Sequence, residues 1–350
     1  MVPTCLQRFR NFWLLAVGLI LGACHPDAAV APEINLSVHP INFPEPVYSY
    51  QNNPLTPAGF ALGRKLFYDP ILSKDGSISC GSCHKQFAAF ADLEHKVSHG
   101  IDDKLGTRNT PALANLRWNP DFFWDGGVNH LEVVPLSPIT NPVEMGADLG
   151  QVIRQLNRDP NYVVAFNKVF HQDSINSQQL FRALAQFMGE LISANAPYDK
   201  YLNGQQDALT AEQKQGLLVF EAKCSTCHKP GLFTDFSFRN NGLDATFTKD
   251  QGRYHITEAP TDLGKFKVPS LRNVALTAPY MHDGRFWTLE QVLAHYTTGV
   301  KKSATLDPVL DGDLPGIALS ETEKNQLLSF LEALTDESFI QNKQFSAPQP

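Results

Sequence analysis

The feature that most constrains this chain is a five-residue pattern, Cys-x-x-Cys-His, that occurs twice. It reads CGSCH at residues 80–84 and CSTCH at residues 224–228. A Cys-x-x-Cys pair suits a thiol–disulfide couple, half of a zinc site or covalent attachment of a c-type haem, and only haem attachment specifically needs the following histidine. Because the histidine is present in both copies, the sequence favours two haem c groups, and a cysteine-rich zinc site is the main alternative.

In the haem interpretation, each pattern supplies two thioether bonds to the porphyrin and one proximal ligand to the iron. The residues are Cys80, Cys83 and His84 for the first haem, and Cys224, Cys227 and His228 for the second.

The N-terminal residues predict export. MVPTCLQRFRN carries two arginines and leads into FWLLAVGLILGA, an apolar run of signal-peptide length that is short for a bilayer span. The run ends in LGAC, which resembles the lipobox of bacterial lipoproteins. We therefore predict a signal peptide at residues 1–23, a lipid anchor on Cys24 and a periplasmic, membrane-anchored protein. The alternative is an ordinary cleaved signal in which Cys24 has no role.

These assignments use all six cysteines. Cys5 leaves with the signal peptide, Cys24 takes lipid, and the other four take haem. No thiol remains for a disulfide, which an exported protein would otherwise be expected to form.

Composition argues against a nucleic-acid partner. Charged residues make up 19% of the chain and the net charge is -7, so there is no basic stripe for a phosphate backbone.

Apolar spacing predicts a mainly α fold. Leu180 to Leu191 and Leu327 to Leu334 each form an apolar stripe at helical spacing, and another helix is expected from Thr56 onward. Capping boxes at Thr210, Thr288 and Ser320 support further helix starts. Long connections at 98–147 and 229–287 are rich in Gly, Pro and Asn, and we interpret them as functional loops around haem.

The chain is expected to form two cytochrome c-like haem domains joined by such loops. The predicted segments are a signal peptide at 1–23, a loosely packed tether at 24–54, an N-terminal haem domain at 55–197, a C-terminal haem domain at 198–335 and a tail at 336–350.

The second axial ligand of each iron decides between electron transfer and chemistry. Met281, in the loop APYMHDG, is the best candidate for the second haem, with His282 as the main alternative and Met145 as a weaker one. Met188 sits in an apolar stripe and is expected in the core. For the first haem, His95 and His99 are candidates, and the same two histidines also suit a polar surface loop.

Seven motifs together resemble the bacterial di-haem cytochrome c peroxidases, the superfamily that also includes MauG. In chain order they are KLFYDPILSKDGSISCGSCH, GTRNTPALAN, FFWDGG, PITNPVEMG, CSTCH, FKVPSLRN and TAPYMHDGRF. They cover roughly residues 55 to 335, which is nearly all of the expected mature chain.

The resemblance implies that the N-terminal haem is the peroxidatic site and that the C-terminal haem, with Met281, receives electrons. Glu144 matches the family's distal acid–base group, and Pro138 matches a residue near the same face. Trp124 matches a tryptophan that lies between the haems. Asn109 matches a calcium ligand, with backbone carbonyls of residues 262–264 as companions.

Two positions depart from the family pattern. Residue 134, where relatives often have glutamine, is valine. The displaceable distal histidine of bis-histidine members aligns near Ile101, which cannot bind iron. Either His99 replaces it or the first haem is five-coordinate at rest.

The expected function is reduction of hydrogen peroxide to water with electrons from a small exported cytochrome c or a cupredoxin. Relatives are often dimers, which makes a homodimer a candidate assembly. One alternative is MauG-like oxidation of a side chain on a partner protein. Met281 argues against this alternative, because MauG has tyrosine at the corresponding position. The other is a non-catalytic di-haem electron carrier.

Overall fold

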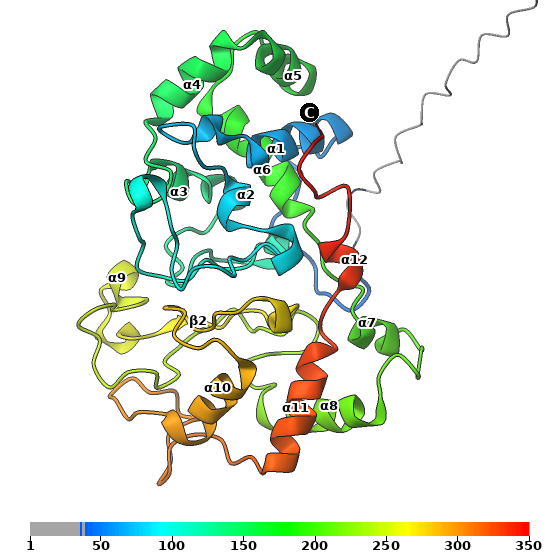
Figure 1. Cartoon of the computed structure of the whole chain (residues 1–350), viewed down its shortest axis with the longest axis vertical. Coiled ribbons are helices and arrows are strands. Elements are labelled where there is room, and N and C mark those ends of the chain that lie inside the picture. The colour runs from blue at the N-terminus through cyan, green and yellow to red at the C-terminus, as the bar shows by residue number, and fades with distance from the viewer. Residues whose placement is uncertain (1–35, 37–38, 350) are drawn as a thin grey trace, which may run out of the picture. The chain divides into compact units, whose positions relative to one another are not determined.

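The segments with helical apolar spacing form helices, and turns and long loops connect them (Figure 1). The computed structural model describes residue 36 and residues 39–349. The α-helices are α1 (Pro57–Tyr68), α2 (Cys80–Cys83), α3 (Leu136–Thr140), α4 (Leu149–Arg158), α5 (Pro160–Phe170), α6 (Ser177–Gly189), α7 (Pro197–Leu202), α8 (Ala211–Lys223), α9 (Tyr254–Thr257), α10 (Leu289–Ala294), α11 (Glu321–Glu332) and α12 (Glu337–Ile340).

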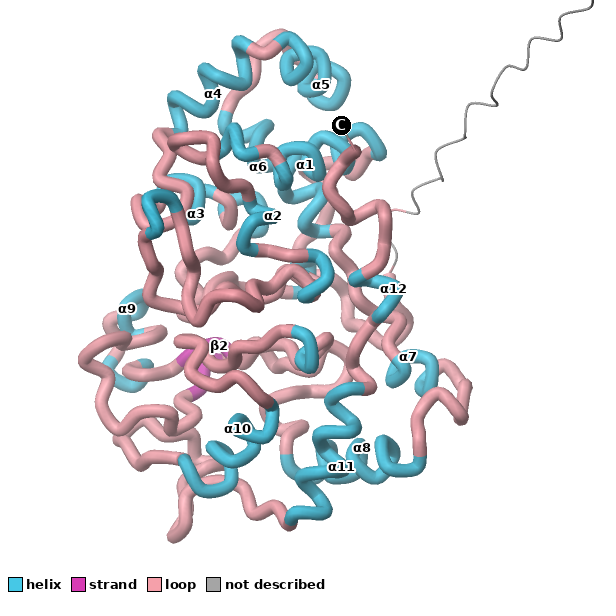
Figure 2. The backbone as a smooth tube through the Cα atoms, in the orientation of Figure 1, coloured by secondary structure: helices cyan, strands magenta, loops and turns pink. Residues whose placement is uncertain are grey.

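Strands contribute little to the described residues. β1 (Phe238–Arg239) and β2 (Phe266–Lys267) pair antiparallel, and Figure 2 shows that most of the remaining chain is loop. The prediction of a mainly α fold is confirmed. The predicted capping boxes at Thr210, Thr288 and Ser320 are also present, at the starts of α8, α10 and α11.

Helix α1 precedes the first Cys-x-x-Cys-His pattern and packs tightly against α6. Thr56 caps α1 by accepting a hydrogen bond from the Gly59 backbone N–H at 3.0 Å. Gly63 permits the close approach, because a Cβ there would lie 1.9 Å from the Ala183 carbonyl oxygen. Phe67 and Phe187 fill the contact, with their ring centroids 5.1 Å apart.

Helix α8 precedes the second pattern and repeats this arrangement with α11. A Cβ at Gly216 would lie 1.9 Å from the Gln326 carbonyl oxygen. The rings of Phe220 and Phe330 lie 5.3 Å apart. Each Cys-x-x-Cys-His pattern therefore follows a helix that a glycine allows to pack closely against a later helix (Figure 1).

The end of the predicted tether is packed, which corrects the expectation of a loose arm through residue 54. Phe43, Tyr48 and Asn53 are buried. The Trp118 indole N–H donates to the Pro44 carbonyl at 2.7 Å, and the Tyr48 hydroxyl donates to Glu132 at 2.9 Å. Residues 43–53 therefore belong to the packed body of the protein.

The predicted C-terminal tail is also packed. Phe339 in α12 is buried, and the Tyr68 hydroxyl donates to the Phe345 carbonyl at 2.7 Å. The guanidinium of Arg64 donates to the Ser346 carbonyl. The chain end thus returns to α1 (Figure 1).

The predicted signal peptide and Cys24 lie outside the described residues. Within residues 39–349, no helix combines the length and the apolar character that crossing a membrane requires.

Candidate functional site

The first Cys-x-x-Cys-His pattern forms one helical turn, α2, that positions His84. The His84 backbone N–H donates to the Cys80 carbonyl at 2.8 Å, and its ring Nδ1 donates to the Phe90 carbonyl at 2.8 Å. Burial lowers the pKa of His84, which favours the neutral ring. With Nδ1 as the donor, Nε2 carries the lone pair that a metal needs.

The second pattern has the same local geometry at the end of α8. The His228 backbone N–H donates to the Cys224 carbonyl at 3.0 Å, and its ring Nδ1 donates to the Phe233 carbonyl at 3.1 Å. Burial also lowers the pKa of His228. Both histidines are therefore oriented by a backbone carbonyl a few residues further along the chain.

Both patterns line one cavity of about 880 Å³. Its remaining wall is largely apolar, as in cofactor sites generally. Cys80, Cys83, Cys224 and Cys227 have free thiols, as thioether formation requires. The residues present therefore fit covalently attached haem.

The zinc alternative gains no support in the described part of the chain. The cluster there that could hold a metal ion consists of Asp92, Glu94 and His95, and it contains no cysteine.

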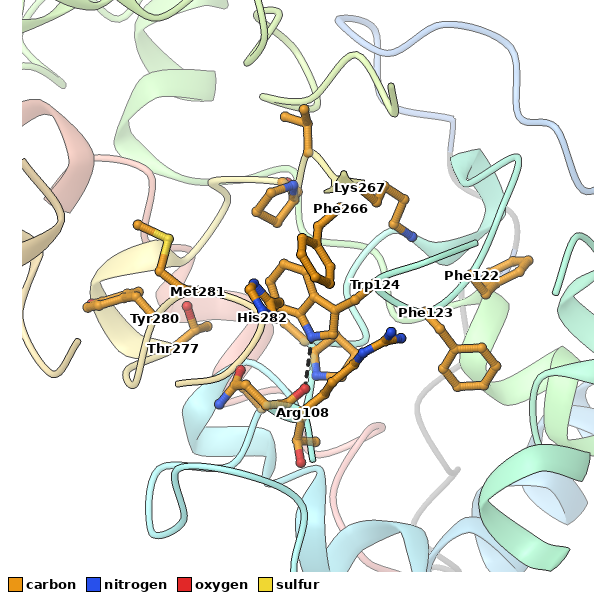
Figure 3. Close-up of a pocket in the computed structure, with 18 of the residues that line it drawn as sticks. Arg108, Phe122, Phe123, Trp124, Phe266, Lys267, Thr277, Tyr280, Met281 and His282 are labelled. Atoms are coloured by element: carbon orange, nitrogen blue, oxygen red, sulfur yellow. Dashed lines mark hydrogen bonds between the residues drawn. The ribbon is translucent and has the colours of Figure 1, made fainter. Parts of the chain in front are cut away.

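Met281 and His282 point in different directions (Figure 3). Met281 lines the cavity with a positive φ of 74°, and the Asn241 side-chain amide donates to its sulfur at 3.4 Å. The His282 ring instead stacks on Phe266, with centroids 3.6 Å apart and an interplanar angle of 9°. These contacts favour Met281 over His282 as the sixth ligand of the second haem, and that assignment stays a prediction.

The two other candidate methionines are more enclosed by the protein. Met145 is 4% exposed, and its backbone bonds to Pro138 and Lys74. Met188 is also 4% exposed and belongs to α6, whose buried face packs against α1.

Trp124 and Asn109 connect segments far apart in the sequence. The Trp124 indole N–H donates to the Asn109 carbonyl at 2.9 Å (Figure 3), and the Asn109 N–H donates to the His282 carbonyl at 2.8 Å. The Trp124 carbonyl accepts from the Lys267 N–H at 2.8 Å. Trp124 is thus bonded directly to β2 and, through Asn109, to the loop that carries Met281.

Arg108 anchors the same region. No sequence pattern had indicated this role for Arg108. Its guanidinium binds Asp250 through two hydrogen bonds of 2.7 and 2.8 Å and also pairs with Asp125. This bidentate geometry fixes residues 108 and 250 relative to each other. GTRN was recognised as a motif, but the pairing with Asp250 depends on the fold.

Glu144 lines the cavity together with Ser98, Val134 and Pro138. The Ser98 hydroxyl donates to Glu144 Oε1 at 3.4 Å. Burial raises the pKa of Glu144, so its carboxyl group releases a proton less readily than an exposed one. A carboxyl group with a raised pKa on a largely apolar wall is suited to exchanging a proton with a ligand.

His99 lines the cavity together with Cys83 and His84, and polar side chains surround its ring. Its Nδ1 lies 3.0 Å from His95 Nε2, and its Nε2 lies 3.4 Å from Asp103. The His95 Nδ1 in turn lies 3.1 Å from the buried Asp92. Both ring nitrogens of His99 therefore have protein partners.

Ile101 is part of the core. It is 3% exposed, and its N–H donates to the Glu144 carbonyl at 2.8 Å. The segment where relatives carry a displaceable histidine is therefore packed here against the Glu144 loop.

Asn109 is 7% exposed, and its side-chain amide donates to the Lys96 carbonyl at 3.3 Å. The Asp262 carboxylate accepts from Thr257 at 2.9 Å and lies near Lys265. These contacts do not test calcium binding at Asn109 or at residues 262–264, which stays a prediction.

Comparisons with known proteins agree with the motif resemblance. The family described as di-haem cytochrome c peroxidase matches residues 57–207. The methylamine utilization protein MauG of Methylorubrum extorquens is 37% identical over 298 residues, covering 84% of this chain and 83% of that protein. The cytochrome c551 peroxidase of Pseudomonas aeruginosa is 35% identical over 261 residues, covering 72% of this chain and 75% of that protein.

Among solved structures, a MauG-like protein associated with microbial copper homeostasis superposes with a TM-score of 0.81 at 33% identity. The match covers 89% of this chain and 98% of the other.

Proposed function

Since this chain belongs to the di-haem cytochrome c peroxidase family, we propose that it reduces hydrogen peroxide to water with electrons from a small exported cytochrome c or cupredoxin. That it is a haem peroxidase follows from its relatives named cytochrome c peroxidase. The observation that carries the proposed reaction is Glu144, whose buried carboxyl group has a raised pKa on the wall of the cavity.

The reaction consumes one peroxide, two electrons and two protons and forms two waters. Haem supplies the iron and the electrons that break the O–O bond. Glu144 takes a proton from one peroxide oxygen and returns it to the other, so the departing oxygen leaves as water and not as hydroxide. Ser98 orients the Glu144 carboxyl group, and Pro138 and Val134 are further neighbours on the cavity wall.

Electrons enter at the C-terminal haem and pass to the N-terminal haem by way of Trp124. Support comes from the position of Trp124, which bonds to β2 and, through Asn109, to the loop of Met281. Met281 would hold the C-terminal haem as a second iron ligand, which would suit that haem to electron transfer. The two halves of the chain are the two haem domains of this scheme, and the repeated helix pairs α1–α6 and α8–α11 support that division.

In the same proposal, no side chain of this protein would bind the second face of the first haem at rest. Support comes from the packing of Ile101, from the hydrogen bond between His99 and His95, and from the proximity of His99 to Asp103. The protein would then react with peroxide without prior reduction.

Three further features belong to the proposal. The protein is periplasmic and held to the membrane by lipid on Cys24, it binds Ca²⁺ near Asn109, and it forms a homodimer.

A MauG-like role is the second candidate, in which a side chain of a partner protein supplies the electrons. The observations that favour it are the likeness to MauG and to a MauG-like structure, together with the lack of a histidine at position 101.

The test is peroxide-dependent oxidation of a reduced cytochrome c by the haem-loaded protein, both fully oxidised and after one-electron reduction. Turnover in both states is expected. Turnover only after reduction would contradict the open face of the first haem. A spectral response to peroxide without turnover in either state would favour the MauG-like role, and no response at all would indicate an electron carrier.

A further inference from the structure

Lys267 is a half-buried residue on the wall of the cavity, and its ammonium group has no carboxylate partner. Its Nζ donates to the Asp121 backbone carbonyl at 2.8 Å, and its backbone N–H donates to the Trp124 carbonyl at 2.8 Å. Asp121 and Asp125 are close enough to act on its charge, but neither forms an ion pair with it. Figure 3 shows the Lys267 side chain extending from β2 near Trp124 and Phe266.

The arginines of the cavity wall differ from Lys267 because aspartates neutralise them. Arg108 pairs with Asp125 and Asp250, Arg239 pairs with Asp235 and Asp307, and Arg272 pairs with Asp199. These guanidinium groups need no charge from a ligand.

A partly desolvated ammonium with a single carbonyl partner is unfavourable, because the carbonyl only partly replaces the water that has been lost. Burial accordingly lowers the pKa of Lys267 to about 8. An anion bound in the cavity would supply the missing charge. A haem brings such anions, since its porphyrin carries two propionate carboxylates, and a lysine binds a carboxylate as a point charge.

The segment that follows Lys267 runs along the site of the second haem. The Val268 carbonyl accepts from the Thr234 hydroxyl at 2.6 Å. The next carbonyl, that of Pro269, is a hydrogen-bond partner of the His228 ring. Lys267 is therefore two residues from a direct contact of the second proximal histidine.

We propose that the Lys267 ammonium binds a propionate of the haem attached at Cys224, Cys227 and His228. The Lys267 backbone N–H is also bonded to the Trp124 carbonyl. One short segment would therefore hold both the second haem and the tryptophan. The inference requires haem at the second pattern but does not depend on peroxide turnover.

The experiment measures the reduction potentials of both haems by spectroelectrochemical titration of the holoprotein without peroxide. Lys267→Met is expected to lower the potential of the second haem, because removing a nearby positive charge favours the ferric state. Lys267→Arg should keep the potential near that of the unmodified protein. Lys265→Met is the matched control, since Lys265 lies on the same segment, pairs with Asp262 and is absent from the cavity wall.

Lys267→Gln covers the case in which Lys267→Met does not take up haem, because its amide keeps a donor for the Asp121 carbonyl while lacking the charge. A lower potential of the second haem in Lys267→Gln, with a shifted propionate band in resonance Raman spectra, would support the proposal. A potential equal to that of Lys265→Met would overturn it. A shift confined to the first haem would overturn the assignment to the second.

Discussion

The indole nitrogen of Trp124 donates a hydrogen bond of 2.9 Å to the backbone carbonyl of Asn109, whose own N–H binds the carbonyl of His282. The tryptophan is therefore tied, through one residue, to the loop that carries the candidate iron ligand Met281. Two successive hydrogen bonds fix the indole relative to that loop, which suits the proposed place of Trp124 on the electron path between two haems.

Trp124→Phe is expected to slow electron transfer between the haems while leaving both haem spectra in place. Phenylalanine is harder to oxidise than tryptophan and cannot donate to the Asn109 carbonyl. The measurement is reduction of the second haem by a photochemical reductant, followed by the rate at which the first haem is reduced. Trp287→Phe is the control, because Trp287 is 49% exposed and absent from the cavity wall. Equal rates in the two variants would exclude Trp124 from the electron path.

Glu144→Gln is expected to slow peroxide reduction by about 10²- to 10⁴-fold, the usual contribution of acid–base assistance. Glutamine keeps an acceptor for the Ser98 hydroxyl but cannot carry the proton. Steady-state oxidation of a reduced cytochrome c measures the loss, and absorption spectra check that both haems remain. Exposed Glu212→Gln serves as the control and should turn over normally. Normal turnover in Glu144→Gln would remove this residue from the mechanism.

The pH dependence of turnover should report the same carboxyl group. Burial raises the pKa of Glu144 above the usual value of about 4.3, and the carboxylate form is needed to accept the first proton. Activity should therefore fall as the pH drops through a pKa above that of an exposed glutamate. The acid limb of kcat/KM measures it, and a limb at or below the ordinary value would contradict the assignment.

The sequence predicted the helices because their signals are local. Thr210 and Ser320 begin capping boxes that are visible as short sequence patterns, and the apolar residues of α6 repeat at helical spacing. The packed segments around Phe43 and Phe339 carry no such period, since single aromatic residues bury into surfaces made by distant parts of the chain. Local patterns cannot reveal such long-range contacts.

In the candidate site too, the sequence predicts the features that depend on neighbouring residues and misses those that depend on distant ones. In each Cys-x-x-Cys-His pattern, a backbone hydrogen bond within the five residues places the histidine relative to the first cysteine. The sequence alone could therefore predict that these residues lie together. The pairing of Arg108 with Asp250 joins residues 142 positions apart, and the lack of a carboxylate partner at Lys267 depends on what the fold leaves around it. The orientation of His99 likewise depends on side chains at 95 and 103.

Met281→Ala is expected to abolish the low-spin His/Met signature of one haem and to lower its potential, because methionine ligation raises it. Electron paramagnetic resonance of the oxidised protein and the near-infrared methionine-to-iron band provide the measurement. Met145→Leu is the control, since Met145 also lines the cavity but is buried beside Pro138. If the His/Met signature survived in Met281→Ala, the ligand would be another methionine such as Met145, whereas absence of the band from the unmodified protein would point to His282.

His99→Ala is expected to leave the resting spectrum of the first haem unchanged, because the His99 ring is hydrogen-bonded to His95 and lies beside Asp103. The oxidised variant should still turn over peroxide. His95→Ala is a useful partner variant, since it removes the contact at Nδ1 and frees His99 to move. A change from low-spin to high-spin iron in His99→Ala would instead identify His99 as the resting ligand.

Cys24→Ser is expected to release the protein from the membrane fraction. In the proposed lipoprotein the lipid is attached to Cys24, and no helix in residues 39–349 is long and apolar enough to cross a bilayer. Fractionation of cells that express the full chain, followed by haem staining, locates the protein. Cys5→Ser is the matched control and should stay with the membrane, because Cys5 precedes the apolar run and would be removed with the signal peptide. Retention of both variants would show that something other than Cys24 holds the protein to the membrane.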